Sequence, residues 1–294
     1  MAVFERRYRP YRGPLTPERS RWRVLPRYAI REVLRTRLLF AYIVLCLVNP
    51  LLWACWIYLP YNVTFLRTFF EQIGASGTPG FFSWTADRFF YGFMLPQAIL
   101  AFFLVFLIGP VLISSDIRNN ALPLYFCRPL DRWEYLRGKS AVLIVLVSTV
   151  TWVPGLLLFL LKAYLAGGRW LVDHARTGVA ILLAWWIWIA VMTLVSLSVS
   201  AYVKWRPVAR LGLFFIFVVG AGFAGILNLT LRTRWGSLFD VGGMLRVVWS
   251  ALFGVDLGPA AVPLPAAWLS LLVVCAICVG LLQRKVRAYE VVRS

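Results

Sequence analysis

The chain has 294 residues, of which 61% are hydrophobic and only 15% are charged, and its formal net charge is +19. Soluble domains are about 45–50% apolar, so this composition excludes an ordinary soluble domain, which could not bury so much apolar surface. In a soluble protein the positive charge would suggest nucleic-acid binding. Here most Lys and Arg flank long apolar runs, which is typical of membrane proteins and argues against a nucleic-acid partner.

Residues 1–37 are predicted to form a cytoplasmic basic arm followed by an interfacial helix. They lack a short apolar core with a cleavage site, so we expect no cleavable signal peptide. Arginines recur at every fourth position opposite an aromatic and aliphatic stripe, a pattern typical of a helix lying in the membrane interface near lipid headgroups. The residues that define this predicted helix are Trp22, Arg23, Arg27, Arg31 and Arg35.

Six apolar runs that follow are each long enough to span a bilayer, which takes about 20 residues of helix. They are nearly free of formal charge, as a spanning segment should be. The sequence therefore predicts an all-α polytopic protein whose transmembrane domain covers 38–282 and whose cytoplasmic tail covers 283–294. The predicted spans are 38–59, 89–115, 140–165, 179–202, 211–229 and 265–282.

The basic residues predict the orientation of these spans. Of the 31 Lys and Arg, 23 fall in 1–37, 116–139, 203–210 and the tail, all of which lie on one side if there are six spans. Cytoplasmic segments carry the excess of positive charge. We therefore expect a multi-pass protein of the cell membrane with both termini in the cytoplasm.

The fifth span contains two pairs of small residues four positions apart, Gly220 with Ala224 and Ala221 with Gly225. This spacing lets two backbones approach closely, so it predicts a packing face. The face could serve packing within the chain or contact with another subunit, and the pattern does not distinguish the two.

The segment 230–264 is apolar but contains Asp240, Arg246 and Asp256, and it is too interrupted to span. Leu245, Val248, Trp249 and Leu252 would share one face of a helix. We therefore predict one or two short re-entrant helices that dip into the outer interface before the last span.

Catalysis or metal binding inside a membrane needs several converging polar side chains, and the predicted spans lack them. No catalytic or metal-binding residues are therefore predicted. His174 is a lone loop histidine, and Cys275 and Cys278 have metal-site spacing without a second pair. The run from Arg137 to Ser140 resembles the end of a phosphate-binding loop, but Trp133 stands where that motif needs Gly. We expect no cofactor in this chain.

The cytoplasmic segment 116–139 is the strongest candidate for a functional site. Pro129 ends whatever precedes it, and 130–137 is predicted to form a short amphipathic helix with Asp131 near its positively polarised start. Trp133 and Leu136 would supply its apolar face. Such a helix, held close to the bilayer by two spans, is suited to docking a soluble partner.

This segment resembles the signature of the type-2 permeases of ATP-binding-cassette (ABC) transporters, which have a type V exporter-like fold. The resemblance rests on Ser115-Asp116 at the end of the second span, on the stretch from Asn120 to Leu124, on the stretch from Arg128 to Tyr135, and on Gly138-Lys139 at the third span. The interfacial helix, the six spans and the re-entrant helices are similar to that family too. Asn119-Asn120-Ala121 departs from it, since many members have a Gly-Thr pair there.

The resemblance implies an exporter in which two permease copies pair, as a homodimer or heterodimer, and each rests on a separate ATPase subunit that binds ATP and Mg. The interfacial helix would also lean on the ATPase, and substrate would pass between the permeases or come from membrane lipid. The implied ATPase-coupling residues are Arg128, Pro129, Leu130, Asp131, Arg132, Trp133, Glu134, Tyr135 and Arg137.

Two other functions remain open from the residues alone. A membrane-embedded enzyme acting on lipid would need a polar constellation at one interface. A non-transporting membrane scaffold would keep the six spans but would have no need for an aromatic-bearing amphipathic helix between the second and third.

Overall fold

The computed structural model describes residues 24–62, 85–121, 125, 132–258 and 262–290, with side chains up to residue 285. These residues are helical, and none of them forms a β-strand. Six helical stretches are long and apolar enough to cross a membrane, which confirms the six predicted spans. They are Arg37–Asn62, Ala86–Arg118, Arg132–Ala166, Ala175–Tyr202, Arg206–Leu231 and Leu264–Lys285.

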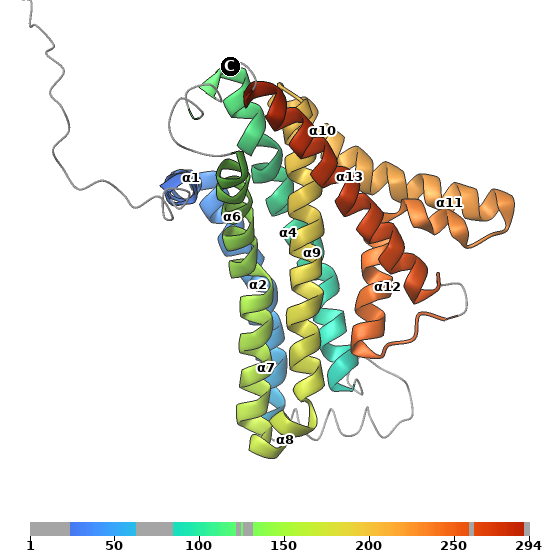
Figure 1. The fold of residues 1–294 in the computed structure, drawn as a ribbon. Coiled ribbons are helices and arrows are strands. Elements are labelled where there is room, and N and C mark those ends of the chain that lie inside the picture. Colours follow the sequence, from blue (N-terminus) through green and yellow to red (C-terminus); the bar gives the residue numbers. More distant parts are fainter. Residues whose placement is uncertain (1–23, 63–84, 122–124, 126–131, 259–261, 291–294) are drawn as a thin grey trace, which may run out of the picture.

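The first four spans lie side by side (Figure 1). The bundle contains α2 (Arg37–Asn62), α4 (Ala86–Arg118) and α9 (Ala175–Tyr202), together with a third span made of two helices, α6 (Arg132–Val150) and α7 (Trp152–Ala166). The short helix α8 (Gly168–Asp173) turns the chain from α7 into α9 at one end. Helix α1 (Val24–Arg35) and the last turns of α13 (Leu264–Glu290) lie toward the other end. The described chain therefore begins and ends at the same end of the bundle.

The second half of the chain is more open. The fifth span consists of α10 (Arg206–Phe214), the π-helical turn η3 (Phe215–Val219) and α11 (Gly220–Leu231), and it points away from the other spans in Figure 1. The chain returns through the 3-10 turn η4 (Trp235–Phe239) and α12 (Val241–Phe253). On the predicted apolar face of α12, Leu245, Val248 and Trp249 are buried, and Leu252 is half-buried.

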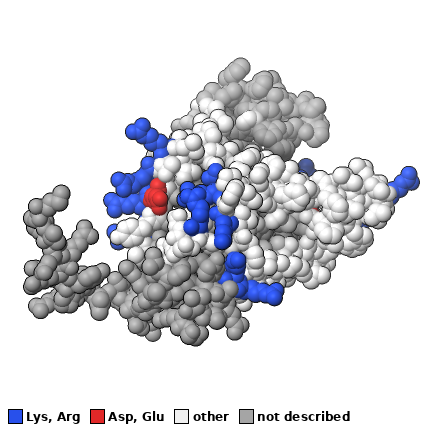
Figure 2. Space-filling view, turned by 90° about the horizontal axis from the view of Figure 1, so that it is seen from above, with Lys and Arg blue, Asp and Glu red and all other residues white. Residues whose placement is uncertain are grey.

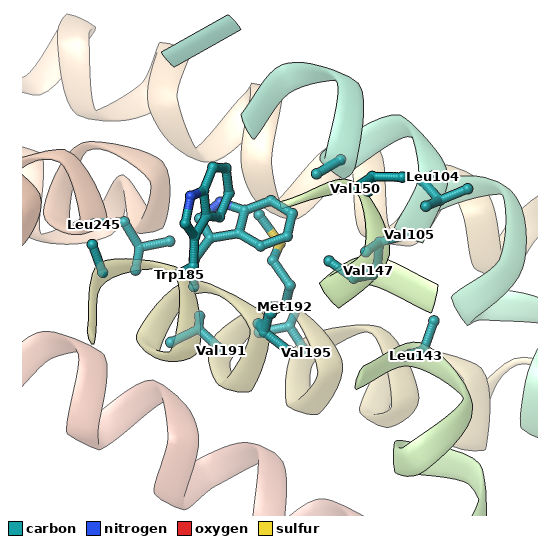
Figure 3. Packing of buried hydrophobic residues seen from close by; sticks show 14 of the residues in the cluster. Leu104, Val105, Leu143, Val147, Val150, Trp185, Val191, Met192, Val195 and Leu245 are labelled. Carbon is teal, nitrogen blue, oxygen red and sulfur yellow. The ribbon is translucent and has the colours of Figure 1, made fainter. Parts of the chain in front are cut away.

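The core forms where α4 and α9 meet at close range. A methyl group added at Gly109 of α4 would lie 2.0 Å from the Oγ and 3.0 Å from the Cβ of Ser196 in α9, so the glycine lets the two helices pack closely here. Aliphatic side chains from α4, α6 and α9 fill the adjoining space around Trp185 (Figure 3). The indole N–H of Trp249 donates to the carbonyl of Ala184 at 3.0 Å, which fastens α12 to α9.

Gln97 of α4 compensates for prolines in two other spans. Pro50 and Pro154 have no backbone N–H, so the carbonyls four residues earlier, at Cys46 and Val150, lose their helical donors. The side-chain amide of Gln97 is fully buried and donates to both carbonyls, at 3.1 Å for Cys46. Its Oε1 accepts from Asn49 at 2.8 Å. One side chain therefore joins α2, α4 and the junction of α6 with α7.

The small-residue face of the fifth span is divided between two environments. Gly220 and Ala224 pack within the chain against η4: a methyl group on Gly220 would lie 3.1 Å from the Phe239 carbonyl, and Gly236 of η4 lies against the Ala224 carbonyl. Ala221 is half-buried, whereas Gly225 is exposed and has no described atom within reach of an added methyl group.

Candidate functional site

The described part of the segment predicted to dock a partner lies at the end of the bundle that carries α1 (Figure 1). Residues 132–137 are the first turns of α6 and run without a break into the third span, whereas we predicted a separate short helix. Gly138 is the weakest helix former between residues 132–137 and the predicted start of the span. A glycine there lowers helix stability by about 1 kcal/mol, which is not enough to end a helix that is buried on one side. Arg128, Pro129, Leu130 and Asp131 lie outside the described residues.

A buried charged cluster joins the end of α4 to the start of α6. The Nζ of Lys139 lies 2.6 Å from the Oδ2 of Asp116, and both side chains are about nine-tenths buried. The hydroxyl of Tyr135 donates to the same carboxylate oxygen at 2.8 Å. The Lys139 ammonium also lies 5.6 Å from the centre of the Tyr135 ring.

Asp116, Tyr135 and Lys139 depend on one another for their stability in this buried position. Each buried charge would be costly alone, but the pairing and the additional hydrogen bond compensate the carboxylate. The motif that the sequence shows contains both Asp116 and Lys139 but does not by itself pair them, although an acid ending one span and a lysine opening the next is a recognisable signal. Tyr135, expected to contact a partner, is instead fully buried.

The outward side of the same helix turns carries the residues that a partner could reach. Trp133 is 43% exposed and Arg137 is exposed, while Arg132 and Glu134 are half-buried. Leu136 is buried, so the predicted apolar face is split: Leu136 anchors the helix and Trp133 points outward. The buried cluster thus fixes α6, and α6 presents Trp133.

Helix α1 packs beside this surface with the predicted amphipathic arrangement. Its aliphatic residues Ala29, Ile30 and Val33 pack against the core, and α1 contacts both α6 and α2. Its arginines point outward; Arg27, Arg31 and Arg35 are all exposed. Trp22 and Arg23 lie outside the described residues.

The end face seen in Figure 2 is rich in basic residues, with little acidic surface among the residues drawn in white and colour. In the described chain, α1, the start of α2, the end of α4, the start of α6, the segment joining α9 to α10 and the end of α13 all carry basic residues. They include Arg27, Arg31, Arg35, Arg37, Arg118, Arg132, Arg137, Lys204, Arg206, Arg284 and Lys285.

Tyr125 lies beside the cluster, with its ring centre 5.7 Å from that of Tyr135. Partial burial, and secondarily the negative charge of Asp116, raise the pKa of Tyr125 above its ordinary value. The phenol is therefore neutral across the physiological pH range and adds no charge to this end.

The sequence offers His174, Cys275 and Cys278 as further residues with possible chemistry. No group of three or more His, Cys, Asp or Glu among them is arranged to hold a metal ion. His174 stacks on Trp170 with ring centres 4.4 Å apart. Cys275 and Cys278 are free thiols in α13, and the Cys278 carbonyl accepts a hydrogen bond from Ser198 of α9.

The described part of the chain is therefore helical, with six membrane-length helices and a basic, aromatic-bearing surface at one end. No protein-family model and no curated protein matches its sequence.

Proposed function

We propose that this chain is the transmembrane permease subunit of an ABC transporter and that it moves a substrate across the membrane, as an exporter, using ATP hydrolysed by a separate subunit. Two copies, or this chain and a related one, would form the transport unit. The surface around Trp133, Arg137 and the arginines of α1 would receive the ATPase, which places this end in the cytoplasm.

The observation that carries the proposal is the Asp116, Tyr135 and Lys139 cluster. Asp116 and Lys139 belong to the stretch that resembles the type-2 permease signature, and they contact each other although they are far apart in the chain. A partner pushing on Trp133 would act on the first turns of α6, and the cluster would pass that displacement to α4. A coupling element needs this kind of rigid connection to the spans, since it works by moving packed helices as bodies.

The break between α6 and α7 supports a mechanism in which the first half of the third span moves with the docked partner. Thr151 has φ −112° and ψ −94°, outside the helical region, and it separates the two halves of the third span. Pro154 cannot donate to the Val150 carbonyl, and the Gln97 side chain supplies the hydrogen bond in its place. We expect the half nearer Trp133 to tilt about this break while the other half stays packed.

The test is co-purification of the tagged full-length chain in mild detergent from its native membrane, followed by assay for an ABC-type ATPase and its ATP hydrolysis. The variant is Trp133→Ala with Arg137→Glu, which removes the exposed ring and reverses the exposed charge. We expect the wild type to retain the ATPase and the variant to lose at least most of it.

A matched control changes the same residue types at the same end but outside α6. Trp205 is 71% exposed and Arg206 is exposed, so Trp205→Ala with Arg206→Glu should leave ATPase retention unchanged. If the wild type retains no ATPase, or both double variants behave alike, the permease proposal loses its basis and a membrane enzyme or scaffold becomes the better explanation.

A further inference from the structure

A cavity of about 470 Å³ lies between α4, η4 and α12, away from the proposed ATPase surface. Tyr91 and Leu95 of α4 form one wall, and Met244 and Val247 of α12 form another. Asp240 and Arg246 also line it and are the charged residues among its lining. The cavity belongs to the half of the molecule near α8, since Tyr91 and Leu95 lie in the first three turns of α4.

The two charged residues are not equally available to a ligand. Asp240 is 15% exposed and precedes the first turn of α12, where the helix dipole stabilises a negative charge. Its carboxylate is pressed so closely against Gly243 that an added methyl group there would lie 2.4 Å from Oδ2. The Asp240 carboxylate thus packs against the first turn of α12 and is less available to a ligand.

Arg246, by contrast, has 60% of its side chain exposed, and its nearest guanidinium nitrogen is 3.7 Å from Asp240, beyond hydrogen-bonding distance. The described residues thus give Arg246 only one distant carboxylate and leave its donors available to an anion. Its donor geometry favours a phosphate, which it can bind through two parallel hydrogen bonds.

We propose that this cavity binds a phosphate-bearing amphiphile such as a phospholipid, with the phosphate at Arg246 and part of an acyl chain against the apolar wall. The wall formed by Leu95, Met244 and Val247 has nothing to offer a small hydrophilic anion, whereas an acyl chain fills it. The volume is within the range of ligand sites, and it accommodates a headgroup and the first part of a chain. The site does not depend on the transport function proposed above.

The experiment measures binding of dioleoyl phosphatidylglycerol to the full-length protein by native mass spectrometry in a delipidating detergent. We expect Arg246→Gln to raise the apparent Kd of the first bound lipid roughly tenfold, the usual cost of losing a charged hydrogen bond. Arg246→Lys should bind between the wild type and Arg246→Gln, because it keeps the charge but loses the two parallel hydrogen bonds. Arg169→Gln, at an exposed arginine of α8, is the matched control and should bind as the wild type does.

Two further arms separate the phosphate from the chain. Val247→Trp fills the cavity without changing its charge and should weaken binding as much as Arg246→Gln does. Dioleoylglycerol, which lacks the phosphate, should bind the wild type roughly tenfold more weakly, and millimolar inorganic phosphate should not displace the lipid. Equal binding of the two lipids, displacement by phosphate alone, or wild-type affinity in both cavity variants would each overturn the proposal.

Discussion

The spans differ far more in their surroundings than in their composition. In the most apolar part of the third and fourth spans, 61% of residues are buried within the molecule, against 11% in α2 and 17% in both the fifth and the sixth span. In α2, Leu51 and Leu52 are 64% and 63% exposed. Hydropathy therefore identifies which segments enter the membrane, and packing alone decides which of them contact protein and which contact lipid or another subunit.

The inner spans also carry the buried polar groups. Ser200 of α9 inserts its hydroxyl into the kinked part of α4, where it accepts from the N–H groups of Ile113 and Ser114 at 2.9 Å and donates to the Pro110 carbonyl at 2.8 Å. Such groups are tolerated in a membrane where protein supplies their partners. We therefore expect changes in the inner bundle to cost stability, and matched changes in the outer spans to cost little.

The largest effect is expected at the buried ion pair. Asp116→Asn leaves the Lys139 ammonium buried without its counter-charge, which should destabilise the protein by about 3–5 kcal/mol. Thermal unfolding of the purified protein in detergent would show this as a strongly lowered Tm.

The double variant Asp116→Asn with Lys139→Met removes both charges and should recover much of the loss. Arg118 lies two residues after Asp116 and is exposed, so Arg118→Gln should leave the Tm near the wild-type value. A double variant no more stable than Asp116→Asn would show that the pair does not depend on mutual neutralisation.

The contrast between hydropathy along the chain and packing between helices also explains which features could be predicted from the sequence. The spans were predictable, because 20 consecutive apolar residues are visible in one dimension, and the apolar face of α12 was predictable from its helical period. The pairing of Asp116 with Lys139 and the capping of Cys46 by Gln97 depend on how one helix faces another. Single-sequence periodicity carries no information about that rotation. The split of Trp133 from Leu136 was missed for the same reason.

A smaller effect is expected at Gln97. Gln97→Leu removes the donor for two carbonyls already deprived of helical partners, and we expect a loss of about 1–3 kcal/mol, measured as a lowered Tm. Pro50→Ala gives residue 50 an N–H that can reach the Cys46 carbonyl, so it should recover part of the stability in the Gln97→Leu background. If Pro50→Ala has the same effect with and without Gln97, the amide does not compensate for that proline.

The most direct comparison of inner and outer spans uses two glycines. Gly109→Ala places a methyl group 2.0 Å from the Oγ and 3.0 Å from the Cβ of Ser196, so the serine must rotate and the contact between α4 and α9 must relax. Overpacking of this kind typically costs about 1–3 kcal/mol. Gly225→Ala meets no described atom and gains helix propensity of up to about 1 kcal/mol. The Tm should therefore fall for the first and stay level or rise for the second.

The Gly225 variant also bears on whether the uncovered part of the fifth span contacts a second subunit. The oligomeric state should be measured by light scattering in detergent alongside the Tm, because a close helix–helix contact at Gly225 would be disrupted by even one methyl group. An unchanged Tm with a shift from dimer to monomer would assign Ala221 and Gly225 to a subunit interface, while Gly220 and Ala224 pack against η4 within the chain. An unchanged Tm with an unchanged oligomer would instead leave this side of α11 facing lipid, where an added methyl group is accommodated without cost.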